Sequence, residues 1–164
     1  MIKAKFVVAL FCIFVLGGSV LAAAQRLYPV QGPAAAQVPP QPFTAKLSNI
    51  YSKSGKISLT QTDGETFQGT WSIITATFAN SKTPGAPASY PPQPNLAFAW
   101  DLVYGPGYYL STILGSENIG QATVIGNHGT MLQLEFHREQ LGAMEDNHFG
   151  VAVDNKGNVY KVVL

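Results

Sequence analysis

The strongest constraint on the fold is an alternation of apolar and polar residues between Thr130 and His137. The apolar side chains fall at every second position, at Leu132, Leu134 and Phe136. A period of two is that of a β-strand with one buried face and one face in water. Two further β-rich runs, Gly150–Asp154 and Val159–Leu164, flank an Asp-Asn-Lys-Gly-Asn turn. The C-terminal part of the chain is therefore predicted to form a strand followed by a hairpin.

Short β-rich runs separated by turn residues continue upstream. Asp63-Gly64, Gly105-Pro106-Gly107 and Asn127-His128-Gly129 are typical of tight turns between strands. The runs predicted as strands are 43–50, 57–62, 66–73, 96–104, 108–114 and 121–126. Gly69 is expected to leave room for the indole of Trp71 or to mark a bulge. The pattern predicts an all-β fold, a single antiparallel β-barrel or β-sandwich of about eight or nine strands.

The first 24 residues have the features of an N-terminal signal helix. Lys3 and Lys5 precede an apolar run from Phe6 to Leu16, and Ala22-Ala23-Ala24 offers a cleavage site. Cleavage there leaves residues 25–164. The alternative is an uncut anchor, which would be the chain's one contact with a membrane. We therefore expect an exported bacterial protein, periplasmic or extracellular.

Residues 25–42 are rich in proline and alanine and are predicted to be an extended linker without a central strand. Residues 43–164 then form one β domain. Within it, 80–95 is predicted to be a long proline-rich loop, and 139–147 a loop or a single helical turn.

Composition excludes several classes of function. Without Lys3 and Lys5 the chain has eight Lys plus Arg against nine Asp plus Glu, with no basic stripe, which argues against nucleic acid. The one cysteine, Cys12, lies in the apolar run of the signal segment, so the mature chain has no disulfide and no thiol nucleophile. No cofactor-binding motif is present, and any partner is an unidentified protein or small molecule.

Two short motifs carry a resemblance to known proteins. Asp63–Trp71 is similar to one MORN-type unit, and Val151–Tyr160 to one strand–turn–strand unit of a propeller, but each occurs once and neither makes a repeat array. Together, behind a signal and a proline-rich leader, they resemble small exported bacterial all-β proteins without an assigned activity. The resemblance implies a similar fold and location, and it assigns no catalytic residue.

A metal site is one candidate for chemistry. Glu135 and His137 share one face of a predicted strand, and His148 follows across a loop, so two imidazoles and a carboxylate would suit zinc with an open position. The alternation places Glu135 and His137 on the polar side of the strand, however, and the ordinary expectation for that side is a wet face with scattered charges. No G-x-S-x-G elbow marks a serine hydrolase, and Asp101, between apolar neighbours, is expected to face water.

Aromatic residues around Gly105-Pro106-Gly107 form the best candidate contact surface. Such rings at a barrel mouth stack on a ligand, or they fill the core and cap one end. The residues are Trp100, Tyr104, Tyr108 and Tyr109.

Three functions remain open at this stage. The first is a non-enzymatic exported protein of the cell envelope, with a binding or structural accessory role. The second is a lipocalin-like carrier of a small ligand, which needs an internal cavity. The third is a metal-dependent hydrolase, which needs Glu135, His137 and His148 to converge.

Overall fold

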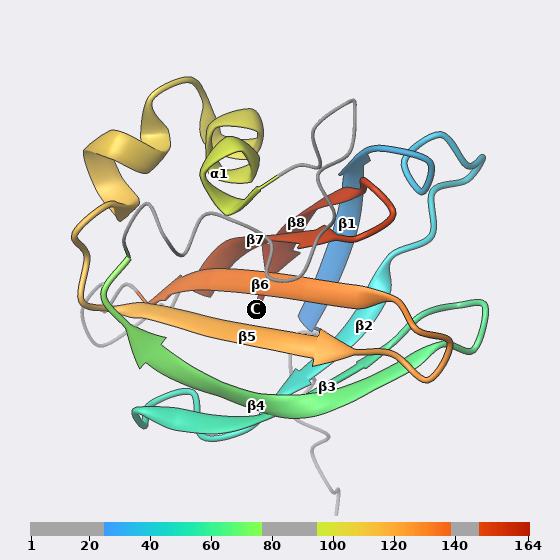
Figure 1. The fold of residues 1–164 in the computed structure, drawn as a ribbon, viewed down its shortest axis with the longest axis horizontal. Coiled ribbons are helices and arrows are strands. Elements are labelled where there is room, and N and C mark those ends of the chain that lie inside the picture. Colours follow the sequence, from blue (N-terminus) through green and yellow to red (C-terminus); the bar gives the residue numbers. More distant parts are fainter. Residues whose placement is uncertain (1–24, 77–94, 139–147) are drawn as a thin grey trace, which may run out of the picture.

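The computed structural model describes residues 25–76, 95–138 and 148–164, and their strands form one closed antiparallel barrel (Figure 1). The all-β prediction is confirmed, and the barrel has eight strands. They are β1 (Gln25–Gln31), β2 (Phe43–Leu47), β3 (Ser54–Thr60), β4 (Thr66–Ile74), β5 (Ile119–Ile125), β6 (Met131–Arg138), β7 (His148–Asp154) and β8 (Val159–Val163).

The strands follow one another around the barrel in chain order. Each pairs with the next, and β8 returns to pair with β1, for example through Leu27 opposite Val162. Closure leaves no unpaired edge among the described strands, and an unpaired edge is the usual hazard of an open sheet.

The predicted strand is confirmed as β6, but its predicted wet face is wrong, because Gln133 and Glu135 are buried as well. Leu132, Leu134 and Phe136 are fully buried and belong to the core inside the barrel. The largest interior side chains are aromatic: Phe43 lies 5.8 Å from Phe67 and 5.0 Å from Tyr160, and Trp71 lies 5.3 Å from Phe136, between ring centroids.

Glycines make room where these large side chains meet the wall. Gly120 lies opposite Phe136, and a Cβ at Gly120 would come within 2.1 Å of the phenyl ring. The expectation for Gly69 is corrected: it pairs in regular register with Ile57, and a Cβ there would lie 2.7 Å from Val124 Cγ1. The glycine that accommodates the indole of Trp71 is Gly55.

Residues 96–104, predicted as a strand, form helix α1 (Leu96–Tyr104). Asn95 caps the helix, because its Oδ1 accepts a hydrogen bond of 2.9 Å from the backbone N–H of Phe98. The buried residues recur at helical rather than strand spacing, at Leu96, Ala99 and Trp100. The alternation that suggested a strand does not match the observed burial, since Phe98 and Leu102 are exposed.

The predicted strand 108–114 is also helical. It forms the π-helical turn η2 (Tyr109–Ile113), in which the N–H of Leu114 bonds to the carbonyl of Tyr109 at 2.8 Å. Helix α1 covers the outer wall of the barrel over β7, and η2 packs beside α1 (Figure 1). A second apolar core therefore lies outside the barrel, where Trp100 and Tyr109 pack with Val151 and Val153.

The expectation that 25–42 lacks a strand is corrected as well. Residues 25–31 form β1, which closes the barrel between β2 and β8. Pro29 is accommodated because the ladder to β8 becomes irregular between Pro29 and Gln31.

The predicted signal segment, most of the loop 80–95 and the segment 139–147 lie outside the described residues. Among the described residues, no helix has both the length and the apolar character needed to cross a membrane.

Candidate binding groove

The four predicted contact aromatics lie on the outer wall rather than at the mouth of the barrel. Trp100, Tyr104 and Tyr108 do come together, with ring centroids 5.1 to 6.0 Å apart. Trp100 and Tyr109 are buried against the wall, and burial raises the pKa of Tyr109 to about 12. Trp100 and Tyr109 therefore fill the core between helix and barrel, and Tyr104 and Tyr108 stay half-buried beside them.

Glu135 lies beneath this helical layer and not in water. Its Oε2 accepts a hydrogen bond of 3.0 Å from Trp100 Nε1, and its Oε1 accepts one of 3.1 Å from Gln121 Nε2. Burial raises the pKa of Glu135 to about 7, although the two donors pull it down. The carboxyl thus joins α1 to the barrel wall.

The three metal candidates do not converge. His137 shares the outer face of the wall with Glu135, and its cross-strand neighbour is Phe149. His148 pairs with Arg138, so it belongs to the other face of the sheet from Glu135 and His137. Its ring lies against Tyr51, with 6.3 Å between the ring centroids. In the described part of the chain, no three His, Cys, Asp or Glu side chains are grouped to hold a metal ion.

One end of the barrel is sealed by a buried polar network around Asp154. Asp154 Oδ2 accepts hydrogen bonds from Tyr160 OH at 2.9 Å and from Asn158 Nδ2 at 2.7 Å. Its Oδ1 accepts two backbone N–H groups, from Lys156 and Asn158. Asn158 Oδ1 in turn accepts the N–H of Ala34, which fixes the β1–β2 connection to this end. The predicted Asp-Asn-Lys-Gly-Asn turn thus closes this end of the barrel.

A second buried carboxylate, Glu65, lies at the same end. It accepts hydrogen bonds from the hydroxyl and the backbone N–H of Thr130, at 2.6 and 3.1 Å, and Lys156 Nζ lies 3.7 Å away. Burial alone raises the pKa of Glu65, but these partners outweigh it and hold the pKa below its ordinary value. Both carboxylates therefore stabilise turns.

The β2–β3 loop, residues 48–53, covers part of the opposite end. Trp71 Nε1 donates to the carbonyl of Ser48 at 3.1 Å, and the guanidinium of Arg138 donates to the carbonyl of Ser52. Asn49 lies in the left-handed region, with φ of 57°, which is uncommon for a residue with a side chain. The loop is therefore fastened to the barrel at several points.

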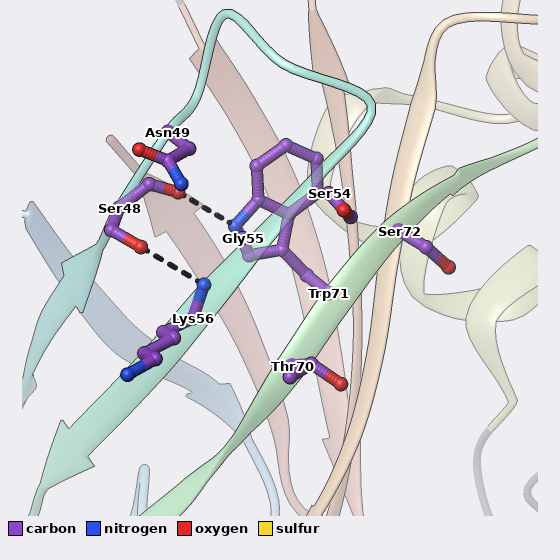
Figure 2. A pocket seen from close by; sticks show the side chains of 8 residues that line it. All are labelled: Ser48, Asn49, Ser54, Gly55, Lys56, Thr70, Trp71 and Ser72. Carbon is purple, nitrogen blue, oxygen red and sulfur yellow. Dashed lines mark hydrogen bonds between the residues drawn. The ribbon is translucent and has the colours of Figure 1, made fainter.

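A polar groove lies between this loop and the neighbouring strands (Figure 2). Its volume is about 420 Å³, within the range of small-molecule sites. It is lined by Ser48, Asn49, Ser54, Gly55, Lys56, Thr70, Trp71 and Ser72, and we call this set the β3–β4 groove.

The geometry of the β3–β4 groove is fixed by close backbone packing. The Oγ of Ser48 accepts the N–H of Lys56 at 2.9 Å (Figure 2). A Cβ at Gly55 would lie 2.0 Å from the carbonyl oxygen of Ser48, so only glycine allows the loop and Trp71 to meet there. The walls are thus held in place without a ligand.

The exposed side chains of the groove are free to bind. Ser54, Thr70 and Ser72 are exposed, and their hydroxyls make no hydrogen bond to other described residues. A hydroxyl both donates and accepts, so this lining suits a ligand that bears hydroxyl groups of its own. A second hollow of about 430 Å³ continues along β3 and β4 and shares Lys56 and Thr70 with the first.

Sequence reasoning missed this groove because its residues look like an ordinary wet strand face. The available indication was the outward parity of β3 and β4, where Ser54 pairs with Ser72 and Lys56 with Thr70. It also missed the buried state of Glu135, since nothing in the alternation indicated that a helix covers that face of β6.

Comparisons with family models, with curated proteins and with solved structures found no significant match.

Proposed function

We propose that this protein is an exported, non-enzymatic binding protein of the cell envelope that holds its ligand in the β3–β4 groove. The observation that carries the proposal is the contrast between a polar groove on the outer wall and an interior filled with aromatic side chains. The bacterial origin and the envelope location belong to the proposal and rest on the N-terminal sequence.

The packed interior supports binding on the outer surface over the carrier alternative. Phe43, Phe67 and Tyr160 are in ring contact across the interior, and each is about 1% exposed. A ligand inside would have to displace these rings, at the cost of their packing. The outer groove requires no such displacement.

The roles of the buried acids support binding over hydrolysis. Asp154 accepts four hydrogen bonds from its own turn and from Tyr160, and Glu135 accepts one from the helix and one from β5. A catalytic acid or base has to reach a substrate. These carboxyl groups instead hold structural elements together.

Export with cleavage after Ala24 rests on the N-terminal sequence, where a positive start and an apolar run precede Ala22-Ala23-Ala24. Gln25, the expected first residue of the mature chain, takes part in the barrel, because its Oε1 accepts the N–H of Leu47 at 2.8 Å. Expression of the full sequence in a bacterium, fractionation and N-terminal sequencing test this: we expect an exported chain that starts at Gln25. A cytoplasmic chain that still starts at Met1 would contradict it.

Hydrogen exchange tests the location of binding. The protein is mixed in turn with polygalacturonate, dextran and a tryptic peptide digest, and amide protection is mapped by mass spectrometry. We expect one of these probes to protect 48–56 and 68–72. Protection by none of them, or protection confined to α1, would overturn the proposal.

A matched pair of variants separates the groove from the rest of the wall. Thr70→Val removes a groove hydroxyl, and Thr66→Val makes the same change on β4 at an exposed position outside the groove. We expect Thr70→Val to reduce the protection and Thr66→Val to leave it unchanged. Equal effects would place the ligand elsewhere.

A further inference from the structure

The charge around the β3–β4 groove is positive. Residues 43–62 contain Lys46, Lys53 and Lys56 and no acidic residue, whereas the expected mature chain as a whole has one more acid than it has bases. All three lysines are exposed, and within the described residues none of them pairs with a carboxylate. The hairpin of β2 and β3 is therefore a local cationic surface on a nearly neutral protein.

The fold places these charges at the groove. Lys56 is one of its lining residues. Lys46 faces the same side of the sheet from β2, because it pairs with Ser58, two residues along β3 from Lys56. Lys53 directly precedes β3 on the loop that borders the groove. An anion in the groove thus meets one lysine in contact and two close by.

An exposed aromatic ring stands on the same loop. Tyr51 is 67% exposed, the highest value for an aromatic residue in the described chain. Its ring is placed against His148 at one edge, so its orientation is fixed while most of its surface stays in water. Tyr51 does not line the groove itself, and its exposed ring offers an apolar face on the loop that borders it.

The groove is elongated along the strands. The second hollow continues the groove from Ser72 to Gln68, and a strand rises about 3.3 Å per residue, so the two hollows together run for about 13 Å. That length accommodates an extended ligand rather than a single compact molecule.

We infer that the β3–β4 groove binds an acidic oligosaccharide, one whose sugar rings carry carboxylates. This inference rests on the proposed binding function and names the class of ligand. Lys56 binds a carboxylate, Lys46 and Lys53 attract further ones, and the hydroxyls of Ser54, Thr70 and Ser72 bind the hydroxyls of the sugar.

Calorimetric titration with two defined polymers tests the inference. The full mature chain is titrated with oligogalacturonate, which is acidic, and with a dextran oligomer of similar length, which is neutral. We expect oligogalacturonate to bind and dextran to bind at least about tenfold more weakly, the effect of one charge-assisted hydrogen bond. Raising the salt concentration should weaken the binding of oligogalacturonate alone.

Two variants remove the same charge at different places. Lys56→Gln should weaken oligogalacturonate binding by about tenfold. Arg26→Gln, which removes an exposed charge from β1, should leave binding unchanged. Both positions are exposed, so both variants are expected to keep the fold, and circular dichroism verifies this.

The outcomes separate this inference from the proposed function. If dextran binds as tightly as oligogalacturonate and Lys56→Gln has no effect, the inference of an acidic ligand is wrong. The proposed binding function still holds in that case if Thr70→Val weakens the binding of dextran. If neither polymer binds, the inference is wrong, and the proposed function then depends on whether the peptide digest protects the groove. Equal losses in Lys56→Gln and Arg26→Gln would also contradict it.

Discussion

Replacing Glu135 by glutamine should change how the stability of the protein depends on pH. Glu135 is fully buried between α1 and the barrel wall, with Trp100 and Gln121 as hydrogen-bond donors. Burial raises its pKa from 4.5 to about 7. The folded state therefore holds this proton more tightly than the unfolded chain does.

The sign and size of the effect follow from this difference. The stability that Glu135 contributes is fully present below about pH 4.5. It decreases as the pH rises toward 7, because ionisation is easier in the unfolded chain, and it is constant above 7. Since one pKa unit corresponds to about 1.4 kcal/mol, the free energy of unfolding loses about 3 kcal/mol over this range through this one group.

Glutamine keeps the size of the side chain and cannot ionise. At pH 4.5 the free energy of unfolding of the Glu135→Gln variant should lie within about 1 kcal/mol of that of the natural protein, because a neutral carboxyl and an amide offer similar hydrogen bonds. At pH 8 the variant should be more stable by about 3 kcal/mol, because it carries no buried charge.

Urea unfolding at several pH values between 4.5 and 8 measures this difference. Other titrating groups are common to both proteins, so their contributions cancel in the comparison. Glu117→Gln, at an exposed position near the start of β5, is the matched control and should run parallel to the natural protein. If the free energy of unfolding of Glu135→Gln changes with pH in the same way as that of the natural protein, Glu135 is not the buried, proton-binding group described above.

Three further predictions concern the barrel itself. A chain that starts at residue 43 loses β1, so β2 and β8 lose their shared partner; it should aggregate in size-exclusion chromatography, whereas a chain that starts at Gln25 stays monodisperse. Gly120→Ala forces a methyl group into the ring of Phe136 and should lower the free energy of unfolding in urea by about 1 to 3 kcal/mol; an unchanged value would mean that the wall is not packed as described. Tyr160→Phe removes one donor from Asp154 and should cost about 1.5 to 3 kcal/mol, while Tyr28→Phe at an exposed position should cost little, and equal losses would count against the sealed end.

The strands that could be predicted from sequence are those with a regular apolar face or a tight turn at one end. The alternation of Leu132, Leu134 and Phe136 and the turn at Asp154 indicate β6 and the β7–β8 hairpin, because the inward face and the turn are set by local sequence. The Asp63-Gly64 turn between β3 and β4 was recognisable for the same reason.

The errors arose where two periodicities overlap or where tertiary contacts decide. In residues 96–104, apolar residues occur at both strand and helix spacing, and the Asn95 cap with the buried pair Leu96 and Trp100 was the indication of a helix. In β1, Pro29 suggested a linker, but an irregular ladder to β8 accommodates it. Barrel closure depends on pairing between the two ends of the described chain, which no local pattern reveals.

The candidate groove could not be predicted because its chemistry comes from the assembly of ordinary residues. Ser54, Lys56 and Ser72 are typical of any wet strand face, and only the loop fastened at Ser48 turns that face into a groove. The predicted aromatics, by contrast, were recognisable as a cluster, but their position on the outer wall follows from α1.

A titration followed by methyl and amide NMR tests the central claim most directly, namely that the interior is filled and the ligand binds outside. With oligogalacturonate as the probe, amide signals of 48–56 and 68–72 should shift, while the methyl signals of Leu59, Leu134 and Val162 inside the barrel stay in place. Shifts of these interior methyl groups, with none in the groove, would contradict the account.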